Sequence, residues 1–470
     1  MLYADVAGRI EGLIEEGALR PGDRVPSVRK LSKQQDVSIS TVLQAYSILE
    51  SKGLIEARPQ SGYYVRPGLL PVPQEPRMCR PARAPVRVQR ANLALRIFEA
   101  ERKGILAPLA SALPAPELFP TQGLMRALSR AGRRLGPAVH AYEHVPGYLP
   151  LRRQIARRSL ESGCSLSPDE VIITVGAMEA LNLCLRAVAR PGDTIAIESP
   201  TYFGILQAME SLGLRALEIP AHPRDGMDVD ALKAALARTS VKAVVAMPNF
   251  NNPMGSMMPD GRKQELVEFL ARADIPLIED DIYGDLPVGD ERPRAAKAYD
   301  TRGNVLLCSS FSKSLSPGAR VGWVAPGRFF DEVQTLKFMN TIATATVMQA
   351  GVAEFLSSGG YDRHLRRLRV TFAQQVDRVC DAVVRHFPSG TRLTRPSGGF
   401  VVWVELPRGV DALELEERAA AERIRFAPGP MFSARDSFPN FLRLNCGHPF
   451  TERTDLALRI LGRLAREMAA

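Results

Sequence analysis

The stretch that decides the fold is Cys308-Ser309-Ser310-Phe311-Ser312-Lys313-Ser314-Leu315-Ser316-Pro317-Gly318-Ala319-Arg320. The apolar run 305–307 precedes it and has the character of a buried strand. Lysine can form a Schiff base with an aldehyde cofactor, and serine and arginine side chains bind phosphate. A lysine in a serine-rich loop is more often simply solvated. The neighbouring sequence must therefore separate the two interpretations.

Apolar runs of strand length recur before this stretch, and each is followed by a short loop and a helical pattern. They lie at 171–174, 194–197, 243–247, 275–278 and 305–307. Strands that alternate with helices in this way predict an α/β fold with a buried, mostly parallel sheet. Ligand sites in such sheets gather at the carboxyl ends of the strands, so the residues directly after each run are the candidates.

The first three strand exits carry residues of the kinds that a ring-shaped phosphate ligand needs. Gly176 follows the first run and opens a helix whose free amides can bind a phosphate. Tyr202 follows the second run and could stack on a flat ring. Asn252 follows the third run in an Asn-Pro-Met-Gly turn. Taken singly, an ordinary turn or core packing explains each of them.

The fourth strand exit is the least ordinary, because Glu279, Asp280 and Asp281 follow one another and Tyr283 comes soon after. Carboxylates at the end of a buried strand are costly unless a cation meets one of them. A pyridine-ring cofactor with an aldehyde and a phosphate would use all of these parts. Lys313 would hold its aldehyde, and a carboxylate would keep its ring nitrogen protonated.

The order of these motifs over residues 91–470 resembles that of the fold-type I aminotransferases, which depend on pyridoxal 5'-phosphate (PLP). The resemblance implies that Lys313 is the Schiff-base lysine and that Asp280 and Tyr283 serve the ring nitrogen and the phenolic oxygen. It also implies a smaller C-terminal α+β subdomain. The further cofactor-binding residues that it implies are Gly176, Ala177, Met178, Tyr202, Asn252, Ser310, Ser312, Arg320 and, reaching the phosphate in a partner subunit, Tyr142.

The same resemblance implies a role for Arg443 and a difference in how Ala177 and Met178 would contact the phosphate. Arg443, in Leu-Arg-Leu, corresponds to the arginine that binds a substrate carboxylate, a bidentate role that suits arginine better than lysine. Relatives often carry serine and glutamine where this chain has Ala177 and Met178. At those two positions the resemblance implies phosphate contacts from the backbone.

The N-terminal residues have a different pattern, with three short amphipathic helices followed by a hairpin. The helices are predicted at 2–17, from about 26, and at 40–51, and the strands at 54–58 and 62–65. This is the order of a winged helix-turn-helix, in which the third helix enters a major groove. A small helical adaptor with a solvated polar face is the alternative.

Three segments, 19–29 (LRPGDRVPSVR), 37–42 (VSISTV) and 61–65 (SGYYV), resemble the GntR-type DNA-binding domain. Many members of that family have an arginine where this chain has Ile39. The residues that the resemblance implies in DNA binding are Arg29, Ser38, Ser40, Thr41, Gln44 and, on the wing, Arg58.

Six prolines and five arginines lie between residues 67 and 90, where they predict an extended, semi-rigid tether. A basic segment lying on DNA phosphates is the alternative, and a spacer that gives some electrostatic help to binding is favoured. Residues 1–66 are nearly balanced, with nine basic and eight acidic side chains. The DNA-binding prediction therefore rests on pattern and not on the net charge of +10.

Length and composition limit the class of protein. A chain of 470 residues is too long for one ordinary domain. No apolar run has the length of a membrane span, and charged residues interrupt any N-terminal signal sequence. Six scattered cysteines without a CxxC pair predict neither a disulfide framework nor a metal site. A cytoplasmic location is expected.

Together these segments have the arrangement of the MocR subgroup of GntR regulators. The expected organisation is a DNA-binding domain at 1–67, a linker at 68–90 and a PLP-binding domain at 91–470. The resemblance implies a homodimeric transcriptional regulator that binds double-stranded operator DNA, PLP and an amino acid or amine effector. The alternative is an active aminotransferase of 2-amino acids with an accessory DNA-binding domain. A scaffold without PLP is disfavoured by the intact residue set.

Overall fold

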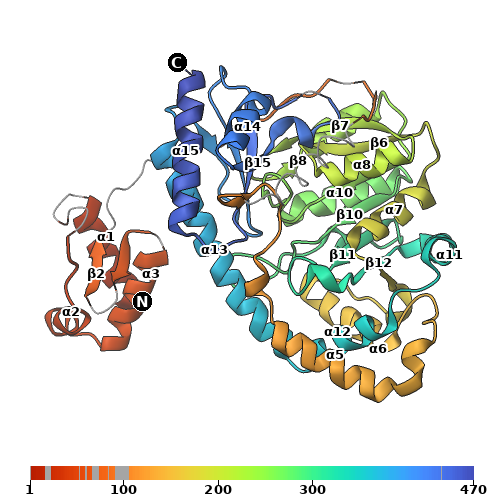
Figure 1. The fold of residues 1–470 in the computed structure, drawn as a ribbon, viewed down its shortest axis with the longest axis horizontal. Coiled ribbons are helices and arrows are strands. Elements are labelled where there is room, and N and C mark those ends of the chain that lie inside the picture. The colour runs from red at the N-terminus through yellow and green to blue at the C-terminus, as the bar shows by residue number, and fades with distance from the viewer. Residues whose placement is uncertain are drawn as a thin grey trace. The chain divides into compact units, whose positions relative to one another are not determined.

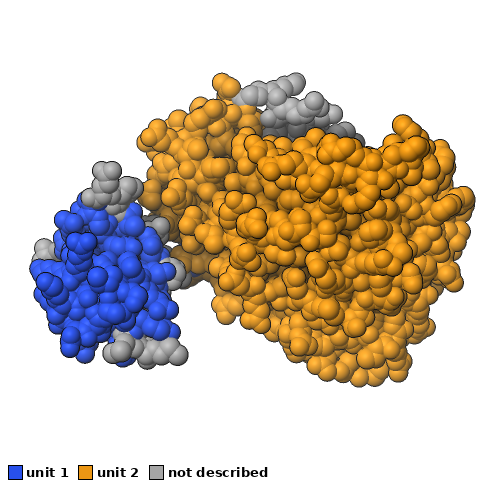
Figure 2. All heavy atoms as spheres, turned by 90° about the horizontal axis from the view of Figure 1, so that it is seen from below, with its two compact units in different colours: residues 1–73 blue, residues 74–470 orange. Residues whose placement is uncertain are grey.

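The structure, a computed structural model, describes residues 2–15, 19, 23–51, 53–58, 61–65, 73–82, 84–89, 105–435 and 437–469. It contains two compact units, unit 1 (residues 1–73) and unit 2 (residues 74–470), which Figure 2 shows in blue and orange. The hydrophobic core of unit 1 draws only on residues between Val6 and Val65 among those described, so it is a core of its own.

Unit 1 consists of three helices and a hairpin: α1 (Leu2–Glu15), α2 (Val28–Gln35), α3 (Ile39–Ser51), β1 (Ile55–Arg58) and β2 (Gly62–Val65) (Figure 1). The two strands pair antiparallel. The side chain of Ser27 begins α2 by accepting a hydrogen bond from the backbone of Lys30. Val42, Tyr46 and Leu49 of α3 are fully buried in the core. The predicted winged helix-turn-helix is confirmed.

Unit 2 is built on a nine-stranded sheet whose order is β3-β7-β6-β9-β10-β11-β12-β5, with β8 added beside β7. The pairs from β7 to β11 are parallel, whereas β12 is antiparallel to both β11 and β5. It follows that β5 runs in the same direction as β11. The strands are β3 (Val86–Arg87), β5 (Ile172–Thr174), β6 (Thr194–Ser199), β7 (Arg215–His222), β8 (Gly226–Met227), β9 (Ala243–Ala246), β10 (Leu277–Asp280), β11 (Val305–Ser310) and β12 (Gly322–Ala325).

Helices cover both faces of this sheet, as the alternation of side chains shows. Ala243 and Val245 of β9 join one core cluster, whereas Val244 and Ala246 join another. Helices α7 (Ala177–Val188) and α8 (Phe203–Ser211) pack on the first face, and α9 (Val229–Leu236) and α10 (Asp260–Arg272) on the second. The predicted α/β architecture with a mostly parallel sheet is confirmed.

The remaining helices of this part lie between β3 and β5 or after β12 in the chain. They are α5 (Thr121–Leu135), α6 (Leu149–Ser159), α11 (Phe330–Thr341) and α12 (Thr346–Ser357).

The C-terminal part of unit 2 is a smaller α+β layer, as expected. Its five-stranded sheet has the order β13-β14-β16-β15-β4. The strands are β4 (Pro108–Leu109), β13 (Arg392–Leu393), β14 (Val401–Glu405), β15 (Arg425–Pro428) and β16 (Phe441–Asn445). Helices α13 (Gly360–His386), α14 (Ala412–Ala421) and α15 (Glu452–Ala469) accompany it (Figure 1).

Residues 74–82 and 84–89, which we call the strap, begin unit 2 and lie against the rest of it. Strand β3 of the strap pairs antiparallel with Arg215 and Ala216 of β7, at the edge of the large sheet. At the other end of the strap, the carbonyl of Gln74 accepts a 3.1 Å hydrogen bond from the backbone of Leu393 in β13. The strap therefore touches both sheets of unit 2.

Side chains reinforce the contacts of the strap. Glu75 forms a 2.7 Å ion pair with Arg224, and the backbone N–H of Arg77 donates to Glu405 at 2.7 Å. Val88 is buried. The proline pattern predicted an extended backbone here, and the docking onto unit 2 is an additional finding. Among the described residues, no helix is long and apolar enough to cross a membrane.

Candidate functional site

The parallel strands β5, β6, β9, β10 and β11 end at one edge of the large sheet. The loops after these strands carry most of the residues that the sequence singled out. Electrostatic coupling among Lys313, Asp280, Tyr283, Tyr202 and Arg443 shows that these five side chains share one site.

Lys313 follows β11 and points back toward an earlier segment of the chain. Its Nζ donates a 2.7 Å hydrogen bond to the carbonyl of Ala112. Burial, together with the nearby charge of Arg443, lowers the pKa of Lys313 to about 8, against the opposing effect of Asp280. The neutral, nucleophilic amine is therefore far more abundant near neutral pH than it is for an ordinary lysine.

Asp280 ends β10 and is 6% exposed. Its Oδ1 accepts a 3.2 Å hydrogen bond from the backbone of Ile282. Burial, together with the neighbouring Asp281, raises the pKa of Asp280 to about 7, against the opposing effects of the Ile282 hydrogen bond and of Lys313. A cation placed beside this carboxyl would hold it ionised, which suits the role of partner to a protonated ring nitrogen.

Tyr283, Asn252 and Arg443 form a chain of polar contacts beside Asp280. The Tyr283 hydroxyl is hydrogen-bonded to Asn252, whose Oδ1 accepts a 3.1 Å bond from Arg443. Arg443 is fully buried and lies over the ring of Phe432, 5.4 Å from its centroid. Burial raises the pKa of Tyr283, so its phenol stays a hydrogen-bond donor throughout the physiological range.

Tyr202 lies at the N-terminus of α8, partly buried, with its ring centroid 4.6 Å from that of Phe203. Burial raises the pKa of Tyr202 to about 12. Its position after β6 leaves an aromatic ring at the same sheet edge as Lys313. This arrangement can stack on a flat ligand.

A second cluster, beside the first, surrounds the start of α7. Gly176 precedes the helix with φ +83° and supplies no side-chain cap. The positive φ of Gly176 favours glycine, and a Cβ there would lie 2.5 Å from the guanidinium of Arg320, which would have to shift. Arg320 donates to the Val175 carbonyl at 2.9 Å, and the hydroxyls of Ser310 and Ser312 are 2.8 Å apart.

This second cluster has the composition of a phosphate site. The N-terminal N–H groups of a helix, here those that follow Gly176 at Ala177 and Met178, attract anions, and an arginine and two hydroxyls add donors.

Tyr142, by contrast, is an exposed residue: it lies after the short helix Gly136–His140 and is 78% exposed.

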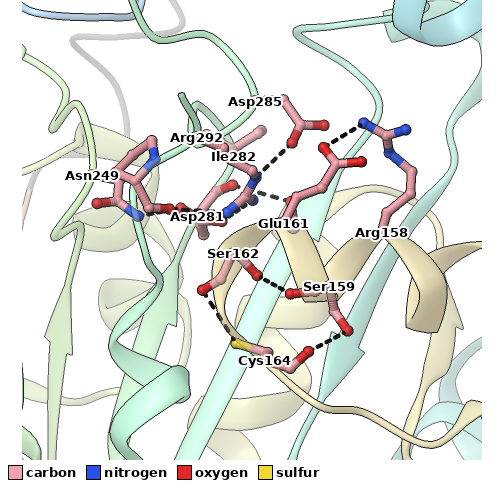
Figure 3. A network of polar contacts seen from close by, with 12 residues as sticks. Arg158, Ser159, Glu161, Ser162, Cys164, Asn249, Asp281, Ile282, Asp285 and Arg292 are labelled. Carbon is pink, nitrogen blue, oxygen red and sulfur yellow. Dashed lines mark hydrogen bonds and ion pairs between the residues drawn. The ribbon is translucent and has the colours of Figure 1, made fainter. Parts of the chain in front are cut away.

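Behind these clusters lies a buried ionic network that the sequence did not reveal (Figure 3). Figure 3 shows the Arg292 guanidinium between two carboxylates, Asp281 at 2.5 Å and Asp285 at 2.7 Å. Asn249, which starts the loop of Asn252, donates to Asp281 at 2.9 Å. Burial alone would raise the pKa of Asp285, but Arg292 and Arg158 lower it to about 2.

The network continues to the residue next to Lys313. The hydroxyl of Tyr361, in α13, donates to Asp285 at 2.9 Å and is 2.6 Å from the hydroxyl of Ser314. His364 lies one turn further along α13, and its Nε2 is 2.9 Å from the carbonyl of Ser314. These contacts fix the loops of Asp280, Asn252 and Lys313 relative to one another.

Each of the three acids at the end of β10 thus has a different polar partner. Asp281 meets Arg292, and the carboxylate of Glu279 accepts backbone hydrogen bonds from Ala296 at 2.7 Å and Lys297 at 2.8 Å. Asp280 is the acid that faces Lys313. No sequence signal marked Arg292, because it lies in a loop eleven residues after Asp281.

On unit 1, the predicted DNA-contacting residues cluster around the start of α3. Arg29, Ser38, Ser40 and Gln44 are exposed, and Thr41 is partly exposed. The Ser38 hydroxyl accepts from the backbone of Thr41 at 3.1 Å, so it also caps α3. The side chain of Arg58 lies outside the part of the chain that the structure describes.

The sequence matches two family models. The model of bacterial regulatory proteins of the gntR family matches residues 2–65, and that of aminotransferase class I and II matches residues 115–460. The chain belongs to the GntR regulators that carry an aminotransferase domain, the MocR subgroup. It is 41% identical over 466 residues to the HTH-type transcriptional regulator YdcR of Escherichia coli, covering 99% of both chains.

Other proteins similar to the aminotransferase domain are named as enzymes. The chain is 33% identical over 388 residues to 2-aminoadipate transaminase of Thermus thermophilus, covering 82% of this chain and 96% of that enzyme. A crystal structure of LysN, the alpha-aminoadipate aminotransferase of that organism, matches with a TM-score of 0.74 and 32% identity. The match covers 79% of this chain and 95% of LysN, which is complexed there with N-(5'-phosphopyridoxyl)-L-leucine. The crystal structure of the multiple substrate aminotransferase of Thermococcus profundus matches with a TM-score of 0.76 and 29% identity. The match covers 81% of this chain and 96% of that one.

These findings confirm a DNA-binding regulator whose larger domain has the fold-type I architecture, with PLP as its cofactor. The residues of this chain fit that cofactor. Gly176 brings the start of α7 close to the Arg320 guanidinium, where a Cβ would displace it, and Asp280 is a buried acid whose direct hydrogen bond comes from backbone. Among the described residues, no group of acids, histidines and cysteines has the arrangement of a metal site.

We expect Arg292→Met to destabilise unit 2 strongly. The substitution leaves Asp281, which is buried, and Asp285, which is partly buried, without their shared cation, so the free energy of unfolding should fall by about 3–5 kcal/mol. Urea denaturation followed by hydrogen exchange of peptides from unit 2 measures this loss.

The matched control is Arg328→Met, which removes an exposed ion pair with Asp274 of similar length, 2.7 Å. That pair should contribute at most about 1 kcal/mol. A loss of the same small size in both variants would contradict the role given to Arg292.

Proposed function

We propose that this regulator senses PLP together with an amino acid or amine, and that the bound ligand changes its affinity for operator DNA. One observation carries the proposal. The same chain holds a complete set of cofactor-type side chains at one sheet edge and an exposed recognition helix, and the strap joins them. The proposed organisation is a DNA-binding domain at 1–67, a linker at 68–90 and a ligand-binding domain at 91–470, acting in the cytoplasm.

PLP would supply an electron-withdrawing ring, and the residues of the chain would hold and orient it. Lys313 would bind the aldehyde carbon through its neutral amine. Asp280 would keep the ring nitrogen protonated, and Tyr283 and Asn252 would bind the ring oxygen. Tyr202 would stack on the ring face. Their hydrogen bonds and mutual charges support these roles.

The phosphate would lie at the start of α7, and the ligand carboxylate would lie at Arg443. The tight approach of Arg320 to Gly176 and the bare N-terminus of the helix support the first assignment. The phosphate holders in this proposal are Gly176, Ala177, Met178, Ser310, Ser312 and Arg320. For the second assignment, Arg443 offers a planar guanidinium, bidentate toward carboxylates, at the Asn252 end of the site.

A ligand can change DNA binding only if it binds two states of the protein with different affinity. The contacts near Arg443 suggest how the difference reaches unit 1. Phe432 lies under Arg443, and Arg435 of the same loop donates to the carbonyl of Ala84 in the strap at 2.7 Å. Cys79 of the strap packs on the same aromatic cluster as Phe432. A ligand at Arg443 would thus act on the strap through this loop.

We expect purified protein with PLP to show a visible absorbance band that Lys313→Ala lacks. Because burial lowers the pKa of Lys313 to about 8, the amount of reactive neutral amine grows as the pH rises toward 8 and is nearly constant well above it. The rate of PLP uptake by the cofactor-free protein should follow the same curve in stopped-flow absorbance.

Lys242→Ala is the control, because Lys242 is an exposed lysine outside the site. This variant should keep both the band and its pH dependence. A band that survives in Lys313→Ala would contradict the assignment of the lysine.

We expect PLP with a suitable amine to change protection of the DNA upstream of the chain's own reading frame. Footprinting at graded protein concentrations should give a change in affinity of about fivefold or more for a coupling of typical size. Lys313→Ala should bind DNA without this response. Hydrogen exchange of peptides from the strap should change with the same ligands. Unchanged exchange rates in the strap would show that it does not transmit the signal.

Arg29→Ala tests the DNA face. It should weaken binding and reduce the slope of log affinity against log salt by about 0.9, the value for one lost phosphate contact. Arg9→Ala makes the same charge change on α1 and should leave the slope nearly unchanged. Equal slopes for Arg29→Ala and the parent chain would remove Arg29 from the interface.

Catalytic transamination of 2-amino acids is the second candidate function. The lowered pKa of Lys313 and the placement of Arg443 favour it, because both are what turnover needs. Panels of amino acids and keto acids separate the two functions, since catalysis yields product in excess of protein and sensing does not.

We also propose that the chain acts as a homodimer. Tyr142 is 78% exposed and would reach the phosphate of a partner subunit, and Phe338 and Met339 of α11 are exposed apolar side chains in the same unit. Sedimentation of the purified protein tests this proposal, and a monomer at working concentration contradicts it.

A further inference from the structure

Two large apolar side chains stand on the solvent side of the recognition helix α3. Ile39 is 50% exposed and Leu43 is 46% exposed. They are four residues apart, so they are neighbours on the helix surface. The other apolar residues of α3 that face the core, such as Val42 and Tyr46, are completely buried. Ile39 and Leu43 therefore form an apolar pair that the core of unit 1 does not use.

The hydroxyl groups nearby are largely engaged with one another. The Ser38 hydroxyl is 2.7 Å from that of Ser40 and 2.8 Å from that of Thr41, and it also accepts from the Thr41 backbone. These groups complete the start of the helix, where the positive end of the helix dipole favours a phosphate. Besides these hydroxyls, the described side chains of α3 that are exposed are Gln44, Ser47, Glu50 and the apolar pair, and of these Gln44 and the apolar pair lie in the N-terminal half of the helix.

The major groove offers one apolar feature, the 5-methyl group of thymine. In helix-turn-helix domains the N-terminal residues of the recognition helix contact base edges, and Ile39 and Leu43 occupy the first and fifth positions of α3. We propose that Ile39 and Leu43 bind thymine methyl groups, so that the operator is read partly by apolar contact. This proposal rests on the DNA-binding function of unit 1.

Gln44 strengthens the choice of DNA as the partner of this surface. Glutamine can bind adenine through N6 and N7, and adenine pairs with thymine. Gln44 follows Leu43 directly, and both side chains are exposed. A·T pairs would thus satisfy the polar and the apolar side chains of one helix face together. An arginine at position 39 would instead favour guanine, so the isoleucine changes the base that this position reads.

The test replaces thymine by deoxyuridine, which removes only the methyl group. The full chain first selects its tightest duplex from a random library. Each thymine of that duplex is then replaced in turn, and the affinity is measured by fluorescence anisotropy. We expect about fourfold weaker binding for each contacted methyl, the effect of one buried CH₂-sized group.

Variants assign the contacts. Ile39→Ala and Leu43→Ala should each bind the thymine and deoxyuridine duplexes equally at one position and keep the preference at the others. Because both side chains are about half exposed, the variants should fold, and hydrogen exchange of unit 1 checks this. Leu13→Ala, at a similarly exposed leucine on α1, should keep every preference.

Two outcomes overturn the proposal while leaving DNA binding intact. One is equal affinity for thymine and deoxyuridine at every position. The other is a preference for thymine over deoxyuridine that survives in both Ile39→Ala and Leu43→Ala. If these variants instead alter self-association of the protein, the apolar pair is a protein–protein contact, which also contradicts the proposal. Failure of the parent chain to select any duplex overturns DNA binding itself, and this proposal with it.

Discussion

The buried guanidinium of Arg292 is the constraint on which the candidate cofactor site depends. Three successive acids end strand β10, and burial of that much negative charge would be prohibitive without compensation. Arg292 pairs with both Asp281 and Asp285, Arg158 adds a second positive charge near Asp285, and backbone N–H groups solvate Glu279. Asp280 is left with a raised pKa, facing Lys313. The network thus selects which acid is available to a cationic ligand.

The same network links separate segments of the chain into one rigid frame. Asn249 fixes the loop of Asn252 to Asp281, and Tyr361 fixes Ser314 to Asp285. The three loops that carry Asn252, Asp280 and Lys313 therefore cannot move independently. Pre-organisation of this kind serves a sensor as well as an enzyme, because it lowers the entropy that a bound ligand must lose.

Local pattern predicted a large part of this molecule. The hydrophobic runs located β5, β6, β9, β10 and β11, because this signal lies within a few residues. The ends were less well predicted: Glu279 and Asp280, expected after the fourth run, are the last residues of β10, and β11 continues to Ser310. Arg292 and Tyr361 escaped prediction because their partners lie eleven and more than forty residues away. The docking of the strap escaped for the same reason: proline fixes backbone conformation, whereas β7 and β13 decide what the extended chain lies on.

Joining the two sites in one chain has a thermodynamic consequence. If an amine bound near Arg443 weakens or strengthens DNA binding by some factor, DNA must change the affinity for that amine by the same factor. The apolar pair on α3 matters here, because contacts that depend on methyl burial demand close approach of the helix to the groove. A small displacement of the helix would reduce the binding free energy of these methyl contacts more than that of the phosphate contacts, which act over longer distances. Sequence-specific binding is then the component that a ligand-driven shift of the strap would disturb first.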